Sequence, residues 1–141
     1  MPSKIRVAVA GVGNAASALV QGIQYYSEGS SRAGLWHPKV GGYSISDIGI
    51  VAAYDTDARK IGSDLSKAIF AEPNVMPKHV NVKTLGVDVE AGMLGYGKQI
   101  PAGNMKTMTR NGSIADSLKK KKVDVLLNLI SSGNDAASKE Y

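Results

Sequence analysis

The chain has 141 residues, the length of one ordinary domain. Hydrophobic residues make up 43% of it and charged residues 21%, a balance typical of globular rather than disordered proteins. No apolar run approaches the roughly 20 residues that cross a bilayer, and no signal-peptide pattern precedes the first apolar segment. The absence of cysteine excludes disulfides and thiolate chemistry. We therefore expect a cytoplasmic protein without a membrane partner.

The formal net charge of +5 comes from 17 lysines and arginines against 12 aspartates and glutamates. Four of the basic residues form the run Lys119–Lys122. A basic patch can bind nucleic acid, but no aromatic residue or arginine is interleaved in this run. Lysines at the end of a helix also complement its dipole. We therefore expect a solvated helix end and no nucleic-acid partner.

The first half of the chain has the pattern of strands separated by a helix. Ile5–Ala10 is an apolar, β-branched run that ends at a glycine, which is typical of a buried parallel strand. A helix is expected next, because apolar residues from Ala16 to Tyr26 recur at spacings of three and four. The polar, glycine-containing segment Ser27–Asp47 predicts a long excursion, and Ile48–Tyr54 predicts a second buried strand.

Further elements are expected between residues 57 and 110. Apolar spacing predicts a helix over about Asp57–Phe70, and Val80–Leu85 could form another strand. Gly86–Arg110 has no clear period. An irregular segment of that length is usually functional or becomes ordered with a partner.

The last segment of the chain predicts one more strand between two helices. Ser113 is a candidate N-cap for a helix that reaches the lysine run, Val123–Ile130 reads as a buried strand, and Asp135–Tyr141 begins a helix. The alternation of strands and helices predicts an α/β fold: a Rossmann-type, doubly wound, mostly parallel sheet. The final helix has barely two turns and no stop signal, so we expect this sheet to be incomplete.

A glycine motif lies between the first strand and the first helix. The spacing Gly11-x-Gly13-x-x-Ala16 is that of dinucleotide-binding turns. The first glycine permits the tight turn, the second lets a pyrophosphate approach the backbone, and the small third residue allows close packing of helix and strand. The N-terminus of the helix offers free amides and partial positive charge to phosphates. A glycine turn of this kind can also serve helix packing alone.

Asp55 supplies the second half of this fingerprint. It follows the second strand, where an acid can accept the ribose hydroxyls of a dinucleotide. It lies 44 residues after Gly11, beyond the usual spacing of about 20 to 30, and the excursion at Ser27–Asp47 accounts for the excess. An acid here favours NAD over NADP, although Arg59 is near. The alternative is that Asp55 only caps the following helix.

Outside the glycine motif and Asp55, the sequence offers few candidate functional residues. Ser131, Ser132 and Gly133 follow the third strand, where the ends of parallel strands line the ligand crevice, so they predict a further wall of the site. His37 and His79 have no partner at metal-ligand spacing, so no metal site is expected. We also find no arrangement of nucleophile, base and acid, and name no catalytic residue.

Four stretches resemble the N-terminal part of inositol-3-phosphate synthase (myo-inositol-1-phosphate synthase), in its bacterial and archaeal branch: IRVAVAGVGNAASALVQGIQYY, GLWHPKVGGYSISDI, VAAYDTDARKIGSDLSKAIF and KVDVLLNLISSG. They extend from Ile5 to Gly133, with poor matching only from Glu72 to Lys120. The second and third stretches are specific to this family, because generic dehydrogenases lack them.

The resemblance implies an isomerase that uses NAD. Members of the family convert glucose 6-phosphate to inositol phosphate by oxidation, aldol cyclisation and reduction, so NAD is regenerated within one turnover. This places the chain in inositol and phospholipid biosynthesis. Residue by residue, the resemblance implies these cofactor-binding positions: Gly11, Gly13, Asn14, Ala15, Asp55, Asp64, Ser131, Ser132, Gly133 and Tyr141.

One departure from the family is Ile130-Ser131-Ser132, where the family typically has a turn of the Leu-Pro type. The family chain is more than twice as long. Residues 1–141 therefore correspond to a truncated NAD-binding Rossmann domain, without the catalytic and tetramer-forming domain. This implies a homo-oligomer only for the complete protein and an inactive isolated chain. The alternative is a stand-alone nucleotide-binding or regulatory module; an ordinary sugar dehydrogenase is disfavoured by the family-specific stretches.

Overall fold

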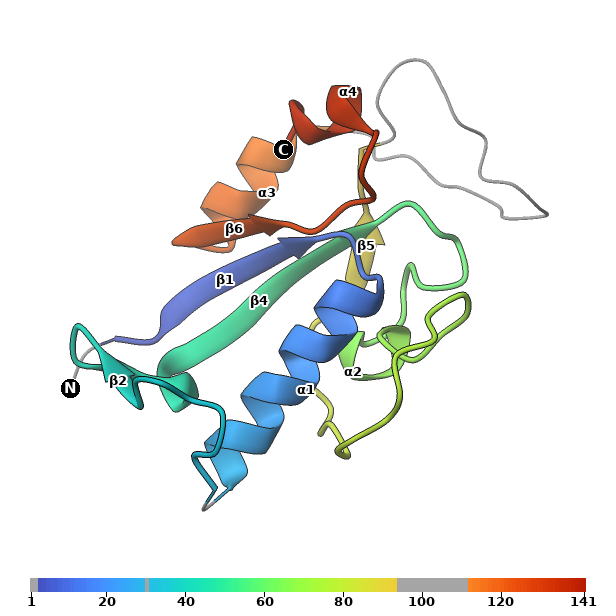
Figure 1. Ribbon diagram of the computed structural model, residues 1–141. Helices are drawn as coiled ribbons and strands as arrows, with labels where there is room; N and C mark the ends of the chain where they lie inside the picture. Colours follow the sequence, from blue (N-terminus) through green and yellow to red (C-terminus); the bar gives the residue numbers. More distant parts are fainter. Residues whose placement is uncertain (1–2, 30, 94–111) are drawn as a thin grey trace.

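The computed structural model describes residues 3–29, 31–93 and 112–141 (Figure 1). Its centre is a sheet with the strand order β5–β4–β1–β6, in which all neighbours are parallel. The strands are β1 (Ile5–Ala10), β4 (Ile48–Asp55), β5 (Val89–Ala91) and β6 (Val125–Asn128). The chain moves outward from β1 to β5 and then crosses to the other side of β1, as in the first four strands of the Rossmann order 3-2-1-4-5-6. The predicted α/β fold with a mostly parallel sheet is confirmed.

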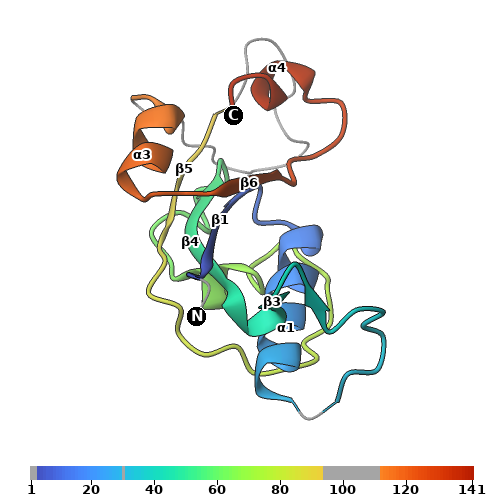
Figure 2. The same cartoon turned by 90° about the vertical axis from the view of Figure 1, so that its left-hand side faces the viewer.

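Helices cover both faces of this sheet, because consecutive residues of a strand point to opposite sides. Val9 of β1 packs in one apolar cluster with residues of α1 (Asn14–Glu28) and α2 (Leu65–Ala68). Its neighbour Ala8 packs in a second cluster with Ile114 of α3 (Ile114–Lys120). Figures 1 and 2 show α1 and α3 on opposite sides of the strands. The central strands β1 and β4 therefore contribute side chains to both apolar clusters.

The excursion between α1 and β4 contains a small hairpin. Its strands β2 (Lys39–Val40) and β3 (Tyr43–Ser44) are antiparallel and are joined by two glycines with positive φ. A short 3₁₀ helix, η1 (Ile45–Asp47), leads into β4. Ser44 and the carboxylate of Asp47 cap it reciprocally, which fixes the start of the long central strand.

The predicted helix over Asp57–Phe70 is wrong. Residues 57–61 form a single turn, and Gly62 then adopts a φ of +83°, which ends it. A new start follows at Asp64, whose carboxylate accepts a hydrogen bond from the Ser66 amide and caps the four-residue α2. The helical spacing of apolar residues continues across Gly62, but the helical backbone conformation does not.

The predicted strand at Val80–Leu85 is also wrong, because this segment bonds to side chains of α1 instead of to the sheet. The amide of Val80 donates to Oε1 of Gln21, and the amide of Lys83 donates to Oε1 of Gln24, both at 3.4 Å. The edge strand is β5, several residues later. Most of Gly86–Arg110, from residue 94 onward, lies outside the described residues.

The C-terminal elements form where the sequence predicted them: Ser113 caps α3 by accepting from the Asp116 amide, β6 lies inside the predicted strand, and α4 spans Asp135–Ser138. The prediction that this strand is buried is wrong, because β6 is an edge strand of the described sheet and its residues are half-buried or exposed. Three lysines of the run are exposed, as expected for a solvated helix end, and Lys121 is half-buried and pairs with Glu90. Within the described residues, none of the helices has the length and apolar character to cross a membrane.

Candidate functional site

A cleft of about 350 Å³ opens where β1, β4 and β6 end. Ligands of open α/β sheets bind at this edge, where the strand order changes direction. Its first wall is the glycine turn, residues 11–14, and its second wall is the turn after β6, residues 131–134. The residues that line it include Gly11, Gly13, Asn14, Ala15, Asp55, Thr56, Asp57, Lys60, Pro73, Asn74, Ser131, Asn134 and Tyr141.

Gly11 is required by the fold. Its φ is +90°, and an added Cβ would lie 2.6 Å from the carbonyl oxygen of Leu129, at the end of β6. Its amide donates to the carbonyl of Tyr54 at 2.8 Å. The first glycine therefore lets the chain pass between the ends of β4 and β6, as the sequence predicted for the tight turn.

Gly13 has no such requirement. An added Cβ would meet no atom of the described residues within 4 Å, and the φ of −93° is accessible to any residue. Gly13 is also the N-cap of the 15-residue helix α1, and no side chain of the described part of the chain caps that end. The start of α1 lines the cleft, and its first-turn amides have no side-chain cap among these residues. This is the geometry expected of a turn that leaves room for a phosphate group.

Asp55 ends β4 and holds the first wall in place. Its carboxylate accepts from the Val12 amide at 2.7 Å with one oxygen and from the Asp57 amide at 2.8 Å with the other. Each carboxylate oxygen has two lone pairs, so both can accept a further hydrogen bond. Asp55 lines the cleft and combines a structural contact with capacity for a ligand hydroxyl.

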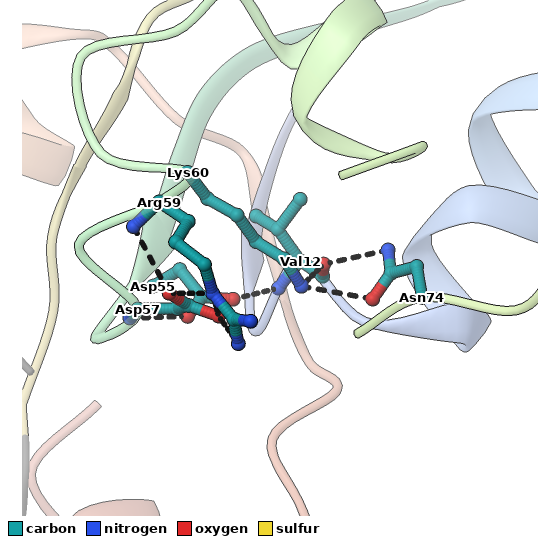
Figure 3. Close-up of polar contacts among 6 residues, drawn as sticks. All are labelled: Val12, Asp55, Asp57, Arg59, Lys60 and Asn74. Carbon is teal, nitrogen blue, oxygen red and sulfur yellow. Dashed lines mark hydrogen bonds and ion pairs between the residues drawn. The ribbon is translucent and has the colours of Figure 1, made fainter. Parts of the chain in front are cut away.

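Lys60 lies buried behind the first wall and was not foreseen from the sequence. Its ammonium donates to the Val12 carbonyl at 2.7 Å and to Oδ1 of Asn74 at 2.8 Å, while Nδ2 of Asn74 donates to the same carbonyl at 3.1 Å (Figure 3). Burial lowers the pKa of Lys60, and the nearby carboxylates of Asp55 and Asp57 oppose that shift. Val12 is therefore held by Asp55 through its amide and by Lys60 and Asn74 through its carbonyl.

The side chain of Asn14 points to the loop that follows α2 rather than into open space. Its Oδ1 accepts from the amides of Val75 and Met76 at 2.8 and 3.0 Å. This loop contributes Pro73 and Asn74 to the cleft. Asn14 thus joins the N-terminus of α1 to a third side of the cleft, and its neighbour Ala15 lines the cleft as an exposed small residue.

A second acid, Asp57, lies next to Asp55 at the rim. Its buried carboxylate pairs with Arg59, with 2.8 Å between Oδ2 and Nη2. Burial alone would raise the pKa of Asp57, but hydrogen bonds from the Arg59 side chain and amide outweigh it and hold the pKa below its ordinary value. The negative charge of Asp57, next to Asp55, is therefore balanced by the positive charge of Arg59.

The second wall is held by fewer contacts. Ser131, Ser132 and Gly133 are exposed, and within the described residues the hydroxyls of the two serines make no hydrogen bond. Of these three, only Ser131 lines the cleft. Tyr141 lies at the opposite side, where its hydroxyl accepts from the Met93 amide at 2.9 Å.

Asp64 lies apart from the cleft lining. Besides capping α2, its carboxylate accepts from the amides of Leu85, Gly86 and Val87. Burial would raise the pKa of Asp64, but hydrogen bonds from Ser66 and from the Leu85 and Gly86 amides lower it to about 2. The structure gives this carboxylate a clear role in joining two segments.

The cleft therefore gathers seven of the ten residues expected from the sequence: Gly11, Gly13, Asn14, Ala15, Asp55, Ser131 and Tyr141. It adds Asp57, Lys60 and Asn74, which sequence reasoning missed. Asp57 had a local signal, since it lies two residues after the strand-end acid Asp55. In residues 3–29, 31–93 and 112–141, no group of three or more acids and histidines is placed to bind a metal ion.

The strand order, the glycine turn and the acid at the end of β4 define a Rossmann-type α/β protein. No protein-family model matches the sequence. Inositol-3-phosphate synthase of Mycolicibacterium smegmatis is 41% identical over 143 residues, which cover 98% of this chain and 39% of that protein. The inositol-3-phosphate synthase of Mycobacterium tuberculosis is 40% identical over 99% of this chain and 39% of its own length. That of Corynebacterium glutamicum is 38% identical over 99% of this chain and 40% of its own length.

Two solved structures have a similar fold. The crystal structure of Ari2 superposes with a TM-score of 0.78 at 34% identity, over 99% of this chain and 41% of that one. A myo-inositol-1-phosphate synthase-related protein from Thermotoga maritima superposes with a TM-score of 0.68 at 22% identity, over 91% and 35%, which shows a shared fold. The chain is thus homologous along nearly its whole length to inositol-3-phosphate synthases, as predicted. It spans about two fifths of the length of these curated relatives.

Proposed function

We propose that this chain is the NAD-binding part of an inositol-3-phosphate synthase, an isomerase that converts glucose 6-phosphate to inositol phosphate in the cytoplasm. The proposal is supported by the named relatives at about 40% identity and by the cleft. The observation that carries it is Gly13, which the fold does not need and which leaves space at the start of α1. When bound, NAD would supply the hydride acceptor and donor of the reaction.

The residues of the cleft fit the parts of a dinucleotide. The first-turn amides of α1 beside Gly13 would bind the pyrophosphate, because they combine free N–H groups with the positive end of the helix dipole. The carboxylate of Asp55 would accept the ribose hydroxyls. Ser131 would border the dinucleotide from the second wall. Lys60 and Asn74 would support the site indirectly, because their hydrogen bonds to the Val12 carbonyl hold the glycine turn in place.

A matched pair of glycine variants tests NAD binding. Neither Gly13 nor Gly22 has an atom within 4 Å of its missing Cβ, but only Gly13 lines the cleft. In calorimetric titrations with NAD⁺, we expect Gly13→Val to weaken binding at least about 30-fold, since the side chain occupies the pyrophosphate space. Gly22→Val should change it less than about twofold. Equal effects, or no binding by the folded wild-type chain, would contradict the proposal.

Asp55 is tested with a second variant. Asp55→Ala should weaken NAD⁺ binding by about 1 to 3 kcal/mol, the range for loss of a charged hydrogen-bond partner. Because Asp55 also accepts from the Val12 amide, circular dichroism must show that the variant is folded. Unchanged affinity in a folded Asp55→Ala protein would remove Asp55 from the site.

The reaction itself is tested in a chimera. The curated relatives extend well beyond the aligned region, so we expect the 141-residue chain alone to bind NAD without converting glucose 6-phosphate. Replacing the aligned segment of the Mycolicibacterium smegmatis synthase with this chain should give a protein that forms inositol phosphate, and Gly13→Val should abolish it. The second candidate function is a nucleotide-binding module without catalysis. A folded chimera that binds NAD but forms no product would support it.

A further inference from the structure

Arg59 is not one of the residues that line the cleft, but it pairs with Asp57, which is one of them. Arg59 directs Nε and Nη2 to the carboxylate of Asp57, at 3.0 Å from Oδ1 and 2.8 Å from Oδ2 (Figure 3). The Arg59 amide donates to the same Oδ1 at 2.9 Å. The Asp57 side chain is 3% exposed, whereas that of Arg59 is 44% exposed. The arginine is therefore at the surface but turned back onto a buried acid.

This pairing bears on the ribose end of a dinucleotide. Proteins that bind a 2′-phosphorylated dinucleotide place an arginine near the strand-end acid, because the guanidinium fork binds phosphate in a bidentate manner. Here one edge of the fork is occupied by Asp57. The other nearby cation, Lys60, is buried and donates to Val12 and Asn74. Among Asp55, Asp57, Arg59 and Lys60, neither basic side chain is therefore unengaged.

We propose that Asp57 determines dinucleotide specificity: by holding Arg59, it makes the cleft accept a free 2′-hydroxyl and reject a 2′-phosphate. This inference rests on the proposed NAD site. Asp57 acts by holding Arg59, so its role differs from that of Asp55, whose carboxylate would accept the ribose hydroxyls.

The side chain of Asp57 is suited to a clean substitution. Its hydrogen bonds within the described residues are to Arg59 alone, whereas its backbone carbonyl makes the turn by accepting from the amides of Lys60 and Ile61. Asp57→Asn keeps an oxygen for the Arg59 amide but removes the charge that binds the guanidinium. The turn can therefore persist while Arg59 becomes available to an added phosphate.

The experiment measures dissociation constants for NAD⁺ and NADP⁺ by calorimetry with the whole chain. For the wild type, we expect NADP⁺ to bind at least about 100-fold more weakly than NAD⁺. Asp57→Asn should reduce this ratio at least about tenfold, because a freed arginine can pair with the 2′-phosphate. The double variant with Arg59→Gln should restore a ratio within about threefold of the wild type, which would assign the gain to Arg59.

The outcomes separate the two proposals. If NAD⁺ binds and Asp57→Asn leaves the ratio unchanged, the inference about Asp57 is wrong and the NAD site stands. If the folded wild type binds neither dinucleotide, the proposed function fails and the inference with it. Arg59→Gln alone provides a test that does not depend on the Asp57 variant folding. Arg59→Gln should leave the ratio of the NADP⁺ and NAD⁺ dissociation constants within about threefold of the wild-type value. A larger fall in NADP⁺ affinity would show that Arg59 is not held by Asp57.

Discussion

The first wall of the cleft, residues 11–14, and the second wall, residues 131–134, follow the neighbouring strands β1 and β6, yet their support differs. The first is tied on both sides of Val12 by Asp55, Lys60 and Asn74. The second is an exposed turn whose serine hydroxyls have no hydrogen-bond partner among the described residues. We infer that the first wall is formed before a ligand binds and that the second takes its final contacts from the ligand.

This difference has a physical reason. A phosphate-binding turn contributes backbone amides, and these must be aligned in advance if binding is not to pay their ordering entropy. Buried polar contacts provide this alignment, since an unpaired buried carbonyl or ammonium is costly. The hydroxyls of Ser131 and Ser132 can instead rotate to suit a ligand. The comparison predicts that substitutions in the first wall affect stability much more than those in the second.

The largest expected effect is at Gly11, and Gly133 in the second wall, which also has a positive φ, is its matched comparison. Gly11→Ala should lower the free energy of unfolding by about 3 to 5 kcal/mol, because it adds a backbone clash with Leu129 to an unfavourable φ of +90°. Gly133→Ala, with a φ of +83° and no atom within 4 Å, should lower it by only about 1 to 2 kcal/mol. Urea unfolding of both variants measures the difference. Equal losses would contradict the unequal support of the walls.

The next effect is at Lys60. Lys60→Met keeps the length of the side chain but leaves the Val12 carbonyl and Asn74 without their charged donor. We expect a loss of about 2 to 3 kcal/mol in unfolding free energy. The exposed Lys67, on α2, provides the control, and Lys67→Met should change stability by less than about 0.5 kcal/mol. Similar values for the two lysines would show that Lys60 does not support the first wall.

Asp64, which lies apart from both walls of the cleft, should make the stability of the fold depend on pH in acid. Its pKa of about 2 lies below the ordinary 3.8, so its carboxylate stabilises the fold above about pH 4 and this contribution is lost as the pH falls towards 2. Allowing for partial exposure, we expect about 1 to 2 kcal/mol. Unfolding free energies of the wild type and Asp64→Asn should converge over this pH range. A constant gap between them down to pH 2 would overturn the assignment.

The smallest effects are expected in the second wall. Ser131→Ala and Ser132→Ala should each change the unfolding free energy by less than about 0.5 kcal/mol, because neither hydroxyl has a partner in the described residues. Ser131→Ala should weaken NAD⁺ binding a few-fold, since only Ser131 lines the cleft. Urea unfolding measures stability and calorimetry measures NAD⁺ binding. A large loss of stability in Ser131→Ala without an effect on NAD⁺ binding would contradict this prediction.

The sequence predicted the parts of this molecule that depend on local signals. Ile5–Ala10 is a strand with the predicted bounds, and Ser113 caps α3 as expected. The helix over Asp57–Phe70 was predicted wrongly because apolar spacing persists through Gly62, whose left-handed backbone breaks the helix. Spacing reports which residues are buried, and it does not show where the backbone hydrogen bonds change partner.

The site was predictable to the same extent. Gly11, Gly13 and Asp55 were found because their spacing and context form a known fingerprint. Lys60 and Asn74 were not, because their function comes from a shared contact with Val12, 48 and 62 residues away. A lysine within an expected amphipathic helix gives no signal of burial. Contacts of this kind become visible only when the fold brings distant segments together.

The most direct test of the unequal walls is amide hydrogen exchange by NMR, measured with and without NAD⁺. In the free chain we predict protected amides at Gly11 and Val12, which donate to Tyr54 and Asp55, and rapid exchange at Ser131–Gly133. NAD⁺ should then slow exchange at the first-turn amides of α1 and in the second wall. Rapid exchange at Gly11 and Val12 in the free chain, or no change at the start of α1 on adding NAD⁺, would contradict this account.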